Sequence, residues 1–158
     1  MFVFVRALTY ATLFTGFLLI YVPGSLLARF GIDRPVGIGW VRNVGLVVGT
    51  LGAVIAVWCI LVFVGTGKGT PAPFDPPRKL VMRGPYRFMR NPMYAGGGMA
   101  LAGAALCYGS LALLTYAAAF LLLSHVFVVS YEEPTLRRTF QEEYEAYCSR
   151  VRRWWPRV

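Results

Sequence analysis

The sequence predicts an all-α integral membrane protein with about four transmembrane helices and a cytoplasmic C-terminal amphipathic helix. Three observations carry this prediction: an apolar composition, four long apolar stretches and an uneven distribution of basic residues. Of the 158 residues, 57% are hydrophobic and 15% are charged, whereas soluble domains average about 45–50% apolar and about 25% charged residues. The chain is therefore too apolar for an ordinary soluble domain of this length.

Four apolar stretches account for this composition. A helix needs roughly 20 apolar residues to cross the hydrocarbon core, and stretches near this length occupy about residues 1–22, 44–64, 92–108 and 111–130. A signal peptide is the alternative for the first stretch, but its apolar run is longer than the usual run of about 7–15 residues. Only a Gly-Ser pair separates the last two stretches, which predicts a tight helical hairpin.

The basic residues lie mainly on one side of the predicted bundle. With four spans, the N-terminus, the 65–91 loop and the C-terminal tail share a side and carry 13 of the 16 lysines and arginines. The positive-inside rule then places both termini and this loop in the cytoplasm. The formal charge of +9 is explained by topology, so the sequence predicts membrane lipid, and no nucleic acid, as a partner.

Cysteines and small residues indicate packing rather than chemistry. Cys59 and Cys107 lie in apolar stretches and Cys148 in the tail, without the spacing of a metal site, so no metal is predicted. Small residues at four-residue steps predict close helix contacts in the second and third stretches. These residues are Gly45, Gly49 and Ala53, and Gly96, Ala100 and Ala104.

The tail after Pro134 has the pattern of an amphipathic helix. Its apolar residues recur at steps of four, four, three and four, and charged residues cover the other face. The apolar positions are Leu136, Phe140, Tyr144, Tyr147 and Val151. Pro134 suits the first turn of a helix, so we expect a break or kink there, with the tail lying on the membrane surface or folding back onto the bundle. Trp154 and Trp155 suit the headgroup layer.

Two polar clusters mark a candidate functional site. One covers residues 78–94 and enters the third stretch, and the other is the Glu132-Glu133-Pro134 run that leaves the fourth. Because these two stretches form a hairpin, the clusters are expected to lie side by side at one membrane face. Acidic residues at the mouth of a membrane bundle are costly unless they are paired or hydrated, which favours a functional role.

The clusters and the tail together resemble a known family. Residues 84–94 (GPYRFMRNPMY), Glu132-Glu133, residues 140–147 (FQEEYEAY) and residues 151–156 (VRRWWP) are similar to the isoprenylcysteine carboxyl methyltransferase and phospholipid methyltransferase superfamily. The similarity covers about residues 78–156. It implies an integral membrane enzyme that binds S-adenosylmethionine in a cytosol-facing pocket without a Rossmann domain.

The resemblance also implies site residues. Glu132, Tyr94 and Arg90 are the candidate catalytic residues, with Glu132 suited to the cofactor ammonium and Tyr86 or Tyr94 to the adenine ring. The implied cofactor contacts are Arg78, Lys79, Leu80, Val81, Tyr86, Asn91, Pro92, Met93, Tyr94 and Glu132. This sequence departs from the family pattern at two of its positions. Asn91 stands where the family usually has histidine, and Val128 where the prenylcysteine enzymes have arginine.

The predicted reaction is methyl transfer from S-adenosylmethionine to a lipophilic membrane-embedded acceptor. A carboxylate acceptor needs no base, whereas an amine acceptor would need Glu132, Glu133 or Tyr94 to take its proton. Residues 1–64 are then a two-helix membrane region and residues 65–158 the catalytic region of one structural unit. Two alternatives stay open: an enzyme resembling NADPH-dependent sterol reductases, with Arg83 and Arg87 near the extra phosphate, and a non-catalytic lipid-binding protein.

One histidine stands near the acidic cluster. His125 precedes Glu132 by seven residues, so a regular helix would place both on nearly the same face. It would then line the path of the acceptor or form a hydrogen bond between buried helices.

Overall fold

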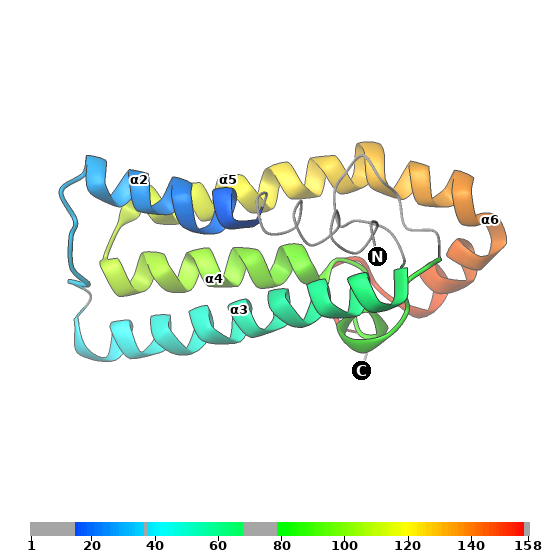
Figure 1. The fold of residues 1–158 in the computed structure, drawn as a ribbon, viewed down its shortest axis with the longest axis horizontal. Coiled ribbons are helices and arrows are strands. Elements are labelled where there is room, and N and C mark those ends of the chain that lie inside the picture. The colour runs from blue at the N-terminus through cyan, green and yellow to red at the C-terminus, as the bar shows by residue number, and fades with distance from the viewer. Residues whose placement is uncertain (1–14, 37, 68–78, 157–158) are drawn as a thin grey trace.

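The computed structural model describes residues 15–36, 38–67 and 79–156, and this part of the chain is built from helices. In Figure 1, α2, α3, α4 and α5 run along the long axis, and α6 extends beyond α5 and turns back at one end. The elements are the π-helix η1 (Phe17–Tyr21), α2 (Val22–Arg29), α3 (Gly39–Gly67), the 3-10 helix η2 (Gly84–Arg87), α4 (Pro92–Tyr108), α5 (Leu111–Phe127), the π-helix η3 (Val128–Glu132) and α6 (Glu133–Arg150). The all-α prediction is confirmed for the described residues.

Two helices in the described part are long and apolar enough to cross a membrane. They are Gly39–Phe63 within α3, and the continuous run Leu111–Arg150, whose apolar part is α5. Seven of the 18 residues of α6 are charged, so we take α5 as the membrane-spanning part of that run. The first predicted stretch lies mostly outside the described residues. A crossing by about four helices stays a prediction.

The predicted hairpin is confirmed between α4 and α5. Gly109 ends α4 in the left-handed region, at a φ of 59°, which glycine adopts without a steric penalty. The Ser110 side chain then caps α5 by accepting a hydrogen bond of 3.3 Å from the Leu113 amide. This turn returns the chain toward the end where α4 begins, so both predicted polar clusters lie at one end of the bundle.

Glycines allow α3 and α4 to pack backbone against backbone. A Cβ atom at Gly52 would lie 2.6 Å from the Gly96 carbonyl oxygen, and one at Gly103 would clash with the backbone of Gly49. The predicted small-residue faces were wrong at one position in each helix, since Gly52 and Gly103 make the contact instead of Ala53 and Ala104. Ala53 is exposed. The reason is the 3.6-residue repeat, which returns a contact face after four and then three residues.

The predicted break at Pro134 was wrong, because the helix continues through it. Glu132 and Glu133 keep helical backbone angles, and the turn before Pro134 widens into the π-helix η3 instead. A proline crowds the carbonyl four residues earlier and donates no hydrogen bond, and a π-turn moves that carbonyl out of the way. The bend of α6 lies further on, at Gln141, whose φ is 42° and ψ −117°.

The same arrangement precedes Pro23. The π-helix η1 leads into α2, so the helix continues to Arg29, beyond residue 22 where the predicted apolar stretch ends. The Leu18 carbonyl accepts a hydrogen bond of 2.9 Å from the Tyr116 hydroxyl of α5. Pro23 has no amide hydrogen to donate to the Leu18 carbonyl, so the bond from Tyr116 satisfies this carbonyl instead. The same bond joins the N-terminal helix to α5.

The tail after Pro134 is helical, and it folds back onto the bundle. Beyond the bend at Gln141, the second half of α6 turns toward the rest of the molecule (Figure 1). All five predicted apolar positions meet in one cluster, together with Leu80 and Cys148. Tyr144 is the most enclosed of them, with 2% of its surface exposed.

Candidate functional site

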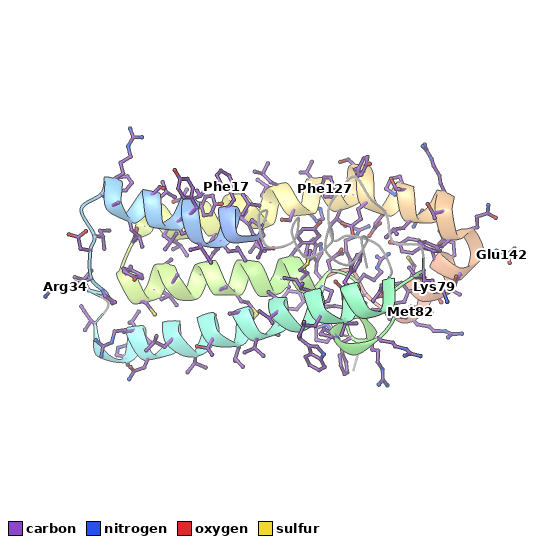
Figure 2. All side chains as sticks on the ribbon, viewed as in Figure 1. Phe17, Arg34, Lys79, Met82, Phe127 and Glu142 are labelled. Atoms are coloured by element: carbon purple, nitrogen blue, oxygen red, sulfur yellow. The ribbon has the colours of Figure 1, made fainter. Side chains whose placement is uncertain are left out.

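The polar side chains gather at one end of the bundle, which we call the polar end. Figure 2 shows Lys79, Met82 and Glu142 at this end and Arg34 at the opposite end, with mainly carbon side chains along the helices between them. The loop that precedes α4, the junction of η3 with α6, and residues after α6 meet here. The predicted meeting of the two polar clusters is confirmed.

Tyr94 and Glu132 join the clusters directly. Tyr94 lies in the first turn of α4, and Glu132 is the last residue of η3. The Tyr94 hydroxyl donates a hydrogen bond of 3.2 Å to Oε2 of Glu132. This contact spans 38 residues of sequence and forms because the α4–α5 hairpin brings both helix ends to the same level.

The Glu132 carboxylate carries little compensation for its charge. Within the described ranges, Tyr94 is its hydrogen-bond partner and no lysine or arginine lies within ion-pair distance of it. Burial raises the pKa of Glu132 to about 7, while the hydrogen bond from Tyr94 lowers it and the neighbouring Glu133 charge raises it. A carboxylate in this state favours a cation that binds beside it.

Glu133 has the opposite surroundings. It is 6% exposed, and Arg153 binds both of its oxygens, with Nε–Oε1 at 2.7 Å and Nη2–Oε2 at 2.8 Å. Arg90 lies 3.4 Å from Oε1. Burial alone would raise the pKa of Glu133, but the hydrogen bonds from Arg153 and the charges of Arg90 and Arg153 hold it below its usual value.

Residues 151–154 form what we call the C-terminal strap, which lies across the start of α4. The Arg90 amide donates to the Arg152 carbonyl at 2.9 Å, within a short parallel bridge between Met89 and Arg152. The Asn91 side-chain amide donates to the Arg153 carbonyl at 3.3 Å. At the far end of the strap, Trp154 Nε1 donates to Nδ1 of His125 on α5 at 3.0 Å.

A family comparison decides what kind of protein carries this site. A model of the phospholipid methyltransferase family matches residues 40–143, about two thirds of the chain. The chain belongs to the phospholipid methyltransferase family. A comparison with curated proteins gives no match. Family membership implies a methyltransferase, and the matched segment contains both Tyr94 and Glu132 but ends before the C-terminal strap.

The cofactor contacts that the resemblance implies in the loop before α4, and at the start of α4, differ from one another in their surroundings. Lys79 is exposed, and Leu80 packs with the aromatic residues of α6. Val81, Tyr86 and Met93 meet around Cys59 of α3. Burial raises the pKa of the Tyr86 hydroxyl, and the Tyr86 carbonyl accepts a bond of 2.6 Å from Tyr147. Arg78 lies outside the described residues, and Pro92 is fully buried at the start of α4.

Arg90 lies on the Glu133 side of the site. Its Nη1 approaches the Cys148 sulfur at 2.6 Å and the Tyr144 hydroxyl at 3.5 Å, besides its contact with Glu133. Its Nε is buried without a partner in the described structure. The guanidinium therefore links α4 to α6, and a catalytic role for Arg90 stays a prediction.

Both departures from the family pattern lie in buried positions. Asn91 is 7% exposed. Its side-chain amide donates a hydrogen bond to the C-terminal strap and does not cap α4. Val128 is fully buried at the first position of η3. A charged side chain at position 128 would therefore lie in a fully buried position.

His125 does not share the face of Glu132. The five-residue turn of η3 shifts the register, so Glu132 points toward α4 while His125 is exposed and bonded to Trp154. The sequence also gave no spacing signal for Arg153 or for the Tyr147 hydroxyl, because their partners lie far away along the chain. Trp155 remains 74% exposed, as a headgroup contact would require.

Proposed function

We propose that the protein transfers a methyl group from S-adenosylmethionine to a lipophilic acceptor that reaches the site from the bilayer. The observation that carries this proposal is the Tyr94–Glu132 pair within the family-matched segment, with a partly buried carboxylate that lacks a cationic partner in the described structure. S-adenosylmethionine carries an ammonium group that would supply this cation.

The residues around the pair fit the remaining parts of the cofactor. Val81 and Met93 offer an apolar wall beside the buried Tyr86 ring, which suits a flat adenine. Lys79 is exposed at the polar end (Figure 2) and would suit the cofactor carboxylate. When bound, S-adenosylmethionine supplies the methyl group as an electrophile.

The chain itself would align the acceptor with that methyl group and exclude water, which is the main requirement of an in-line displacement. A carboxylate acceptor would react in its ionised form. For an amine acceptor, Glu132 would take the proton, since its raised pKa of about 7 suits a base that works near neutral pH. Tyr94 would hold the carboxylate in place during this step.

The bilayer supplies the acceptor in this proposal. The outward face of α3 exposes large apolar side chains along its length, including Val47, Val54 and Leu61, as expected for contact with lipid. We extend the proposal to about four spans with both termini in the cytoplasm, because described basic residues of the loop and tail, such as Lys79 (Figure 2), Arg90 and Arg153, lie at the polar end.

Calorimetric titration of S-adenosylhomocysteine into the detergent-purified protein tests the proposal. We expect saturable binding that Glu132→Gln weakens and that Glu142→Gln, at an exposed carboxylate of α6, leaves unchanged. Absence of binding by the folded wild-type protein would contradict it. Binding of NADPH in place of S-adenosylhomocysteine would instead favour the reductase alternative. Incubation of a lipid extract with labelled S-adenosylmethionine would then identify the acceptor class.

A further inference from the structure

The C-terminal strap binds both structural elements that carry the Tyr94–Glu132 pair. It accepts hydrogen bonds from Arg90 and Asn91 through its backbone carbonyls, and these residues directly precede α4. The Arg153 guanidinium of the strap also donates two hydrogen bonds to Glu133, the residue after Glu132. The strap is therefore a bridge between the start of α4 and the end of η3.

The bridge acts close to the pair. Asn91 precedes Tyr94 by three residues and is the N-terminal cap of α4, so a displacement of Asn91 moves the first helical turn and the Tyr94 hydroxyl with it. Glu133 directly follows Glu132 at the end of the π-helix η3, so a displacement of the Glu133 backbone moves Glu132 as well. Both ends of the 3.2 Å contact thus depend on the strap.

We propose that Asn91 and Glu133 are positioning residues that hold the C-terminal strap in place, and that the strap sets the separation of Tyr94 and Glu132. This inference rests on the proposed function for its catalytic meaning. It adds a working part that lies beyond the family-matched residues 40–143. It also explains the hydrogen bond that Asn91 donates to the Arg153 carbonyl as a contact that holds the strap.

The chemistry of Asn91 provides a sharp test. Asn91→Asp keeps the shape of the side chain but replaces the donating amide with an acceptor that repels the Arg153 carbonyl. Asn91→His restores a donor, because an imidazole N–H can donate to the same carbonyl. Trp154→Phe is a milder second variant, since it removes the donor to His125 and keeps an aromatic ring.

Two measurements on cofactor-free protein test this. The rate of tryptic cleavage at Arg152 and Arg153 reports release of the strap, and the rate of amide hydrogen exchange reports opening of the first turn of α4 and of η3. We expect Asn91→Asp to speed both about tenfold, the effect of losing one hydrogen bond. Trp154→Phe should act in the same direction, and Asn91→His should restore the wild-type rates. Glu142→Gln is the control that should change neither.

Binding of S-adenosylhomocysteine then separates positioning from mere folding. We expect Asn91→Asp to weaken the affinity about tenfold and Asn91→His to recover it. The inference would be overturned if Asn91→Asp or Trp154→Phe sped tryptic cleavage of the strap without speeding amide exchange at α4 and η3. Wild-type protein that binds no S-adenosylhomocysteine would count against the proposed function alone, because cleavage and exchange are measured without cofactor.

Discussion

Glu132 and Glu133 are neighbours in sequence, yet their surroundings differ in nearly every respect. Glu133 is buried and held by two arginines, which lower its pKa. Glu132 has one hydrogen bond from Tyr94 in the described structure, and burial raises its pKa. Two identical side chains therefore occupy different environments: one is paired with two arginines, and the other has no cationic partner among the described residues.

The difference arises from the helix in which they lie. The π-turn η3 ends at Glu132, and α6 begins at Glu133, so the two carboxylates leave the helix toward different neighbours. One meets α4 and the other meets the C-terminal strap. π-turns are often found at functional sites, and here the turn is enforced by Pro134.

The largest effect on stability is expected from Glu133→Gln. This change leaves the guanidinium groups of the largely buried Arg90 and the half-buried Arg153 without their carboxylate, which costs about 3 kcal/mol. A thermal unfolding midpoint in detergent well below that of the wild type would show it. The exposed ion pair of Arg137 and Glu145, at 3.3 Å, supplies the control, because Glu145→Gln should cost less than about 1 kcal/mol. Equal shifts for the two variants would contradict the structural assignment of Glu133.

Glu132→Gln should have the converse effect. We expect the affinity for S-adenosylhomocysteine to fall by about ten- to a hundredfold, the range for a lost charge-assisted hydrogen bond. The unfolding midpoint at pH 8 should rise, because the variant no longer buries an uncompensated charge. Calorimetry and thermal unfolding of the same preparation measure both. A loss of stability without a loss of affinity would remove the distinction between the two residues.

Much of the helical framework was predictable from local patterns. The bounds of α4 and the start of α5 follow from Pro92, Gly109 and Ser110, whose backbone preferences act within a single turn. The apolar face of α6 follows from its repeat. The π-turns were not predictable, because they reconcile proline with a helix that packing keeps continuous. The bend at Gln141 has no proline or glycine beside it that would mark it in the sequence.

The contact between Tyr94 and Glu132 was predictable, because the resemblance singled out both residues and the hairpin places them at one end of the bundle. Their meeting follows from two adjacent helix ends. The roles of Arg153 and Trp154 depend on a chain that returns after the bend in α6, which no spacing in the sequence encodes. His125 was misplaced for a related reason, since the wider turn of η3 rotates Glu132 away from it.

The pH dependence should distinguish Glu132 further. Its folded pKa of about 7 lies above the ordinary carboxyl value, so the stability it contributes is present at low pH and is lost as the pH rises through about 7. We expect cofactor-free wild type to lose about 2 kcal/mol relative to Glu132→Gln between pH 5 and pH 8. Affinity for S-adenosylhomocysteine should change in the opposite sense and increase with pH. Parallel profiles for wild type and variant would contradict this assignment.

The smallest expected effect belongs to Tyr94→Phe, which removes one hydroxyl and keeps the ring. The hydrogen bond from Tyr94 lowers the pKa of Glu132, so its loss should move the midpoint of the pH–affinity profile upward, by less than about one unit. Affinity at pH 8, where the carboxylate is ionised, should fall by only about threefold. Tyr131→Phe, at an exposed tyrosine, is the matched control. An unchanged midpoint in Tyr94→Phe would show that the hydroxyl does not act on the charge of Glu132.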